Sequence, residues 1–135
     1  MALIGSRVVI AAVVTRLGGE SNVTTYLSQG PTPPVGRTCI VHPLPGDPDG
    51  VLGDPDRNVT VRFQTTCIGA TSEQAIWTHD AVVAQLNRQT LTGTGFVTYP
   101  VRIVPGSQQP VRSDDDLATT LFYVTCSWVA IAQPA

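Results

Sequence analysis

The stretch Val59-Thr-Val-Arg-Phe-Gln-Thr-Thr-Cys-Ile-Gly69 alternates in character, residue by residue, along its length. A period of two predicts a β-strand with one face in a core and the other toward solvent. The expected buried side chains are Val59, Val61, Phe63, Thr65 and Cys67. The expected outward ones are Asn58, Thr60, Arg62, Gln64 and Thr66. We therefore expect a half-buried strand over residues 58–68.

A helix is expected directly after this strand. Gly69 ends the strand, and Thr71-Ser-Glu-Gln74 has the pattern of a capping box, in which side chains satisfy the first free backbone N–H groups of a helix. The next residues place an apolar stripe on one helical face: Ala75, Ile76, Val82, Val83 and Leu86. This is the strongest helix signal in the chain.

The N-terminal segment 7–17 has two competing interpretations. Its many β-branched residues favour a strand. The small pair Ala11-Ala12, a capping Ser6 and the stop at Gly18-Gly19 favour a helix, which we prefer. Further strands are expected over residues 22–28, 37–42, 96–104 with an interruption at Pro100, and 119–131.

The last of these strands has two apolar faces of unequal character. One carries Phe122, Val124, Cys126, Trp128 and Ala130, and is expected to face the core. The other carries Leu121, Tyr123, Thr125, Ser127, Val129 and Ile131, which is too apolar for open solvent. We expect partial cover of that second face by a helix or by another subunit.

The expected order is α-β-β-β-α-β-β within a single domain spanning residues 1–135. Runs of strands separated by single helices favour an α+β fold, here a mainly antiparallel sheet flanked by two helices. Residues 43–57 form a long connection rich in Pro, Gly and Asp, which excludes a helix or central strand there.

Charge and hydropathy exclude several classes of protein. All eight cations are Arg and are scattered, and the net charge is −2, so the basic face of a nucleic-acid-binding protein is missing. The longest apolar run near the N-terminus, residues 8–14, is far too short to span a membrane, and no signal peptide is expected.

Catalytic and metal-binding motifs are missing as well. His42 and His79 belong to no metal-ligand spacing, and His79 beside Asp80 is expected to be a helix-surface pair. Cys39, Cys67 and Cys126 form no Cys-x-x-Cys pair, and we expect reduced, buried thiols. Trp77 and Trp128 are expected to be core or interface anchors. The sequence thus predicts no enzyme, no metal and no cofactor.

Two acidic clusters leave alternatives open. Asp47, Asp49, Asp54 and Asp56 lie among prolines, which is typical of a turn-rich loop, although a weak cation site is an alternative. Three consecutive acids, Asp114 to Asp116, precede the final strand. They are expected in a solvated loop, with presentation of negative charge or pairing with Arg of a neighbouring subunit as the alternative.

A resemblance to a known family is carried by motifs in a fixed order. The strand at residues 59–69 is followed by Thr71-Ser-Glu-Gln-Ala-Ile-Trp-Thr-His-Asp80, then by Pro110-Val-Arg-Ser-Asp-Asp-Asp116 and Leu121-Phe-Tyr-Val-Thr-Cys-Ser-Trp128. Upstream, Val41-His-Pro-Leu-Pro-Gly46 is similar to a strand and Pro-Gly turn of the same family. Over about residues 37–131 the chain resembles the tail terminator, or tail completion, proteins of long-tailed bacteriophages.

This resemblance implies a structural virion protein without chemistry or cofactor. Such proteins form a six-membered ring that caps the tail tube, stops its polymerisation and joins it to the head connector. The implied partners are other copies of the chain, the tail tube protein and the head–tail connector. DNA passes through the ring without sequence-specific contact. The implied location is the tail or neck of a virion assembled in the host cytoplasm.

A closed ring needs head-to-tail contacts between copies. We expect the interface residues to include Asp47, Asp49, Asp54, Asp56, Arg62, Asp114, Asp115, Asp116, Tyr123 and Trp128. Two alternative functions remain: a head-completion or connector protein of the same neck region, and a metal- or small-ligand-binding domain that uses the acidic loop.

Overall fold

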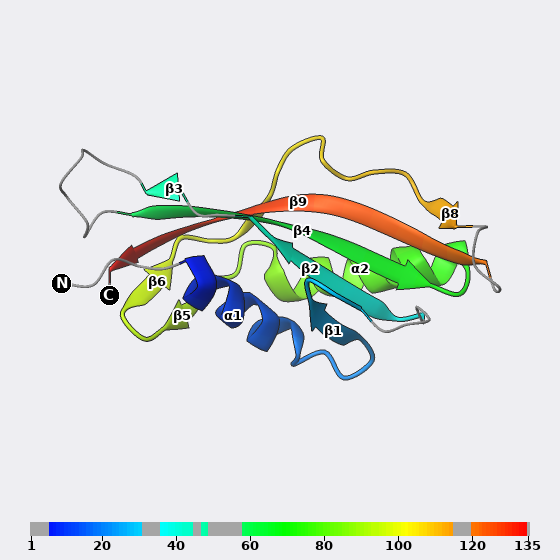
Figure 1. Ribbon diagram of the computed structural model, residues 1–135, viewed down its shortest axis with the longest axis horizontal. Helices are drawn as coiled ribbons and strands as arrows, with labels where there is room; N and C mark the ends of the chain where they lie inside the picture. The colour runs from blue at the N-terminus through cyan, green and yellow to red at the C-terminus, as the bar shows by residue number, and fades with distance from the viewer. Residues whose placement is uncertain (1–5, 31–35, 45–46, 49–57, 115–119, 135) are drawn as a thin grey trace.

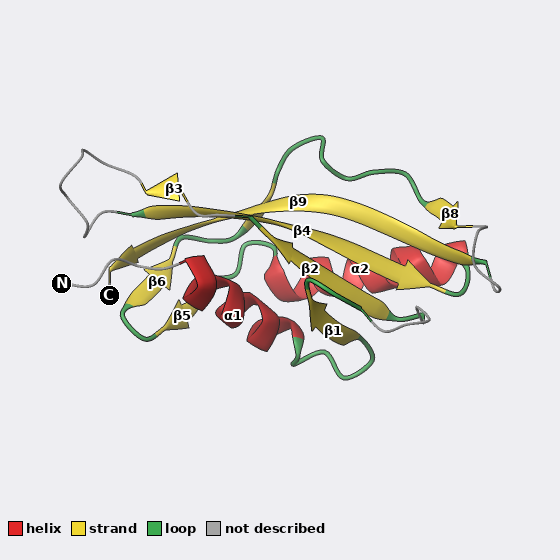
Figure 2. Ribbon diagram, in the orientation of Figure 1, coloured by secondary structure: helices red, strands yellow, loops and turns green. Residues whose placement is uncertain are grey.

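The computed structural model describes residues 6–30, 36–44, 47–48, 58–114 and 120–134. Two helices lie on the same side of a long, curved sheet (Figures 1 and 2). The elements in chain order are α1 (Ser6–Leu17), β1 (Thr24–Leu27), β2 (Thr38–Pro43), β3 (Asp47–Pro48), β4 (Val59–Gly69), α2 (Ser72–Leu86), β5 (Thr92–Gly93), β6 (Phe96–Thr98), β7 (Arg102–Ile103), β8 (Arg112–Asp114) and β9 (Leu121–Pro134).

The expected α+β fold is confirmed, with one correction to its sheet. The main strand order is β1-β2-β4-β9-β6-β5; β3 pairs with β4, while β7 and β8 pair with β9. All of these pairs are antiparallel except β1 with β2, which are parallel, so the sheet is mixed. The chain after Leu27 must therefore return to the starting end of β1 before β2 begins, as parallel pairing requires. Left-handed backbone at Ser28 (φ 67°) and Arg37 (φ 56°) lies at the two ends of this return.

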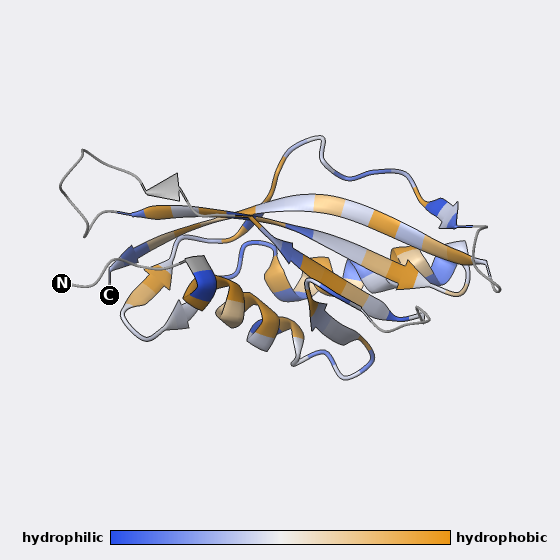
Figure 3. Ribbon diagram, in the orientation of Figure 1, coloured by the Kyte–Doolittle hydropathy of each residue, from blue (hydrophilic) through white to orange (hydrophobic). Residues whose placement is uncertain are grey.

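The central pair of strands, β4 and β9, forms the longest ladder and carries the core. Their register places Phe63 opposite Trp128 and Thr65 opposite Cys126, all on the face toward the helices. All five β4 side chains expected inside are buried, as are Val124, Cys126, Trp128 and Ala130 of β9. Phe122 is only half-buried, because it lies near the start of β9. Figure 3 shows the alternation of apolar and polar residues along both strands.

The helices close this face of the sheet. α1 is a helix, as we preferred, and buries Val9, Val13 and Leu17. In α2, Thr71 Oγ1 accepts a hydrogen bond from the Gln74 N–H at 3.1 Å, and Gln74 Oε1 accepts one from the Ala70 N–H at 2.7 Å. The expected capping motif is therefore present, with the Gln74 side chain reaching one residue further back than in the usual box.

Two expectations for α2 are wrong. Its buried residues are Ala75, Thr78, His79, Val82 and Leu86, so Ile76 is not part of the buried stripe. His79, expected at the surface, is buried. A helical turn has 3.6 residues, and the sheet lies under the row that includes Thr78 and His79. Thr78 is accommodated because its Oγ1 donates to the Gln74 carbonyl at 2.8 Å.

Several short strands lie where loops were expected. Residues 112–114 form β8 along the edge of β9, with Asp114 half-buried opposite Leu121, so the start of the acidic cluster is not simply solvated loop. β3 adds a two-residue pairing to β4 within the long 43–57 connection. The expected interruption at Pro100 is confirmed, because β6 and β7 lie on either side of it.

Candidate assembly surfaces

The expected interface residues that the structure describes do not lie together. Trp128 is completely buried within one copy of the chain: its ring stacks on Phe63 with 6.2 Å between centroids, and its Nε1 donates to Thr65 Oγ1 at 3.0 Å. Trp128 thus anchors the core, which was one of the two roles expected for it, and it offers no surface to a neighbour.

Arg62 and Tyr123 share the face of the sheet that is opposite the helices. Arg62 lies across from Val129 and Tyr123 across from Ile68, so six residues of β4 separate them, about 20 Å. Tyr123 is also paired with Arg112 of β8, two residues before Asp114. Arg62 is exposed, whereas Tyr123 and Asp114 are half-buried. These three residues mark opposite ends of one face rather than a compact site.

The remaining acids are mostly beyond what the structure describes. The backbone of Asp47 pairs with Thr60 in β3. The predictions for Asp49, Asp54, Asp56, Asp115 and Asp116 fall outside the described residues. Their assignment to an interface therefore stays a prediction.

Among the described strands, β1 is at the edge of the sheet, and it was not among the expected interface elements. The Thr24 N–H donates to the Arg37 carbonyl and the Ser28 N–H to the Val41 carbonyl. The even-numbered residues of this segment are therefore the ones that hydrogen-bond to β2. Because alternate residues face alternate neighbours, the backbone groups of Thr25 and Leu27 point away from β2. Leu27 is 48% exposed, and β1 has no charge or proline, the usual protections of an edge strand. Within the described part of the chain, Thr25 Oγ1 is buried without a hydrogen-bond partner.

The outer side of α2 carries a second exposed apolar patch. Ile76 is 45% and Trp77 44% exposed, and the Arg37 guanidinium lies 5.7 Å from the centroid of the Trp77 ring. A cation over an indole face is favourable, and the pair presents a flat, amphipathic surface. Trp77 is thus the tryptophan available for an interface, in contrast to Trp128.

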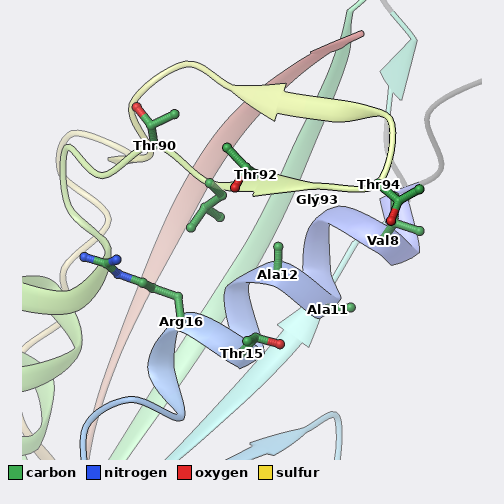
Figure 4. A pocket seen from close by; sticks show the side chains of 10 residues that line it. Val8, Ala11, Ala12, Thr15, Arg16, Thr90, Thr92, Gly93 and Thr94 are labelled. Atoms are coloured by element: carbon green, nitrogen blue, oxygen red, sulfur yellow. The ribbon is translucent and has the colours of Figure 1, made fainter. Parts of the chain in front are cut away.

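A groove of about 450 Å³ lies between α1 and the β5 edge (Figure 4). Its lining is small or neutral, chiefly Ala11, Ala12, Thr15, Thr92 and Gly93. Its one charged side chain, Arg16, donates to the Gln85 carbonyl at 3.0 Å and to Gln89 Oε1 at 3.1 Å. Its described lining contains no carboxylate, imidazole or thiol.

The buried titratable groups are not arranged for chemistry either. A side-chain hydrogen bond from Cys39, together with burial, raises the pKa of the Cys67 thiol, and burial raises the pKa of Cys126. All three thiols are free and buried, as expected. Burial lowers the pKa of His79, against an opposing effect of Asp80. His79 Nε2 lies 2.8 Å from Gln108 Nε2, while its Nδ1 is buried without a partner in the described chain.

Among the described residues, no three His, Cys, Asp or Glu side chains are grouped so that they could hold a metal ion. Neither α1 nor α2 has the length and apolarity that a membrane-spanning helix requires. The described surfaces that remain are therefore the β1 edge, the α2 patch, the open sheet face and the grooves.

Sequence reasoning missed the β1 edge and left Trp77 open between a core and an interface role, for an identifiable reason. An edge strand is recognised only when its position in the sheet is known, and four residues, Thr24 to Leu27, give no such signal. The exposure of Ile76 and Trp77 depends on the rotation of α2 about its axis, which the sheet decides. The one available signal was the apolar pair Ile76-Trp77 next to polar residues at the start of a helix.

Comparisons with known proteins give one informative likeness. No protein-family model and no curated protein sequence matches the chain. Among solved structures, a chain from the virion of a native gene transfer agent particle superposes with a TM-score of 0.64. The likeness covers 95% of this chain and 96% of that one, at 14% sequence identity. The two chains share a fold over essentially their whole lengths.

Proposed function

We propose that this protein is a structural component of a phage-like virion that acts as a tail terminator. In this role, copies of the chain form a ring on the last ring of tail-tube subunits, of the six-membered kind implied by the sequence resemblance. The ring ends polymerisation of the tube and joins it to the head connector.

The observation that carries the proposal is the end-to-end fold likeness to a component of a gene transfer agent virion. A shared supersecondary motif would align only part of each chain, whereas here both are covered almost completely. The order of motifs in the sequence independently resembles tail terminators, which narrows the proposal from a virion protein to a position at the tail end.

The surfaces of the described residues support assembly rather than catalysis. The β1 edge offers an exposed leucine and the outward-facing N–H groups of Thr25 and Leu27, although the Leu27 carbonyl already accepts from the Gln29 N–H at 2.7 Å. The α2 patch offers an exposed tryptophan. These surfaces lie on different elements, so one of them can meet the other on a neighbouring copy in a head-to-tail contact. Repeated head-to-tail contacts close into a ring when the rotation allows.

Deletion of the gene in the parent particle tests the proposed role. We expect tails of variable length, many longer than wild type, because the tube is no longer capped; electron microscopy measures their lengths. Expression of the wild-type chain in trans is the control and restores the length. Tails of normal length that fail to attach to heads would instead support a head-completion protein and contradict a terminator.

A further inference from the structure

A second groove, of about 280 Å³, lies where α2 ends and the chain passes through β7. It is lined by two arginines, Arg88 and Arg102, and by the amide side chains of Asn87 and Gln108. Hydrogen bonds from the Arg88 N–H to the Val101 carbonyl (2.7 Å) and from the Val101 N–H to the Gln89 carbonyl (2.9 Å) fix the two arginine-bearing segments side by side.

The two cations of this groove are not neutralised by the part of the chain that the structure describes. Neither guanidinium has a hydrogen bond or ion pair there, and both side chains are exposed. Arg16 and Arg37, by contrast, are occupied by amide and carbonyl groups and by an indole ring. The Gln108 amide nitrogen already lies 2.8 Å from His79 Nε2. The two guanidinium groups and the Asn87 amide remain as donors suited to carboxylates, which accept paired N–H donors from Arg.

The backbone at Arg88 points to a use for its side chain. Arg88 has φ 63°, the left-handed conformation that usually takes Gly or Asn after a helix. The helix dipole favours a cation near a helix C-terminus. An arginine at position 87, where φ is −64°, would gain the same stabilisation without left-handed backbone. Strained backbone at a non-glycine position is a marker of functional sites, and here it coincides with the cationic groove.

We propose that this groove binds the acidic segment 114–116 of a neighbouring copy, an inference that rests on the ring of the proposed function. The chain itself supplies the complementary charge: three consecutive aspartates at the end of β8. No other segment of the chain has three adjacent acids, so no other segment brings as much negative charge within so few residues to a groove lined by two arginines.

The acidic segment of the same copy cannot fill the groove. Ile103 pairs with Trp128 and Asp114 with Leu121, so seven residues of β9 separate the two sites, about 23 Å. Two further residues extend the chain from Asp114 by at most ~7 Å. The groove and Asp114 therefore lie at distinct places on each copy. Their contact joins different surfaces of two copies, so it can be repeated head-to-tail around a ring.

Charge reversal in an alternating mixture tests the contact. One variant carries Arg88→Glu and Arg102→Glu, and the other carries Asp115→Arg and Asp116→Arg. Each variant alone should associate at least about tenfold more weakly than wild type, because like charges face each other at every contact. An equimolar mixture should assemble again, since each reversed groove then meets a reversed segment and each native groove a native one. Sedimentation velocity measures the masses.

Matched variants separate the contact from folding. The single variant Arg88→Glu should also weaken association. Arg7→Glu changes the charge by the same amount at another exposed position, in the first turn of α1, and should assemble like wild type. Arg88→Gly removes the side chain and the backbone strain together, so it should raise the midpoint of thermal unfolding while weakening association. A lowered midpoint with unchanged association would contradict both arguments.

The remaining outcomes are distinguishable. Groove variants that assemble like wild type would overturn this contact while leaving the ring intact. Groove variants that assemble normally but lose binding to double-stranded DNA would assign the arginines to phosphate and likewise overturn it. A wild-type chain that stays monomeric at every concentration and does not bind tail tubes would instead remove the ring of the proposed function.

Discussion

At the residue scale, the two tryptophans separate stability from assembly. Trp128 is fully buried, stacked on Phe63 and hydrogen-bonded to Thr65, whereas Trp77 is exposed on α2. We expect Trp128→Ala to lower the free energy of unfolding by about 3–5 kcal/mol, the usual cost of a large core truncation. Trp77→Ala should change it by no more than about 0.5 kcal/mol. Urea denaturation at low protein concentration, where association contributes little, measures both.

The outcome for Trp77 also bears on its surface role. Because the Trp128 ring is shielded from water and the Trp77 ring is not, the emission of Trp77 should shift to shorter wavelength when copies associate. A Trp77→Phe variant is the control, since its remaining emission comes from the core. No shift on association would place the α2 patch outside the contact between copies.

The buried His79 should make stability depend on pH. Burial lowers the pKa of His79 in the folded chain below its ordinary value near 6.5, so the unfolded chain binds the additional proton first. The contribution of neutral His79 to the free energy of unfolding is therefore fully present above about pH 6.5 and is lost as the pH falls from there toward the lower pKa of the folded chain. His79→Gln keeps an amide near Gln108. It should reduce the slope with which the free energy of unfolding falls between about pH 7 and pH 5, by an amount that corresponds to at most about one proton.

Chemical denaturation across this pH range checks the slope. The neighbouring Asp80 opposes the effect of burial on the pKa of His79, so Asp80→Asn should steepen the decline. His42→Gln, at a half-buried position on the other face of the sheet, is the comparison for an unspecific loss of histidine. Equal slopes in wild type and His79→Gln would show that His79 does not titrate in this range.

At the element scale, the β1 edge is the point where one sheet can continue into another. Thr25 and Leu27 direct backbone groups outward, and the strand carries no protecting charge. We expect Leu27→Lys to weaken association by at least about tenfold while changing the free energy of unfolding by less than about 0.5 kcal/mol. Analytical ultracentrifugation measures the first and urea denaturation the second.

A matched lysine at Ala84, exposed on α2, tests whether added charge alone is responsible. If Leu27→Lys assembles as well as Ala84→Lys, the β1 edge is not part of the contact. If both variants fail equally, the effect reflects net charge rather than the edge. Only a loss confined to Leu27→Lys agrees with strand pairing between copies.

At the scale of the whole molecule, the sequence was sufficient wherever local period decided the outcome. The alternation of β4 and the cap at Thr71 are set by neighbours in the chain. The parallel course of β1, the burial of His79 and the strand at residues 112–114 depend on which distant segments meet. The arginine groove belongs to the second kind, because hydrogen bonds between residues 88–89 and 101 create it.

The two proposed contacts between copies should respond differently to salt. Interactions between exposed charges are screened over about 10 Å at 0.1 M ionic strength and about 3 Å at 1 M. Association through Arg88 and Arg102 should therefore weaken steadily as sodium chloride rises from about 0.05 to 1 M. Backbone pairing and burial of Leu27 at the β1 edge do not depend on screening in this way.

Sedimentation velocity of the wild type across this range of salt should thus show association that weakens but does not vanish. The dependence of association on salt should be smaller in the Arg88→Glu, Arg102→Glu variant. A salt-independent wild type would leave the β1 edge to hold copies together and would contradict a charge contact in the groove.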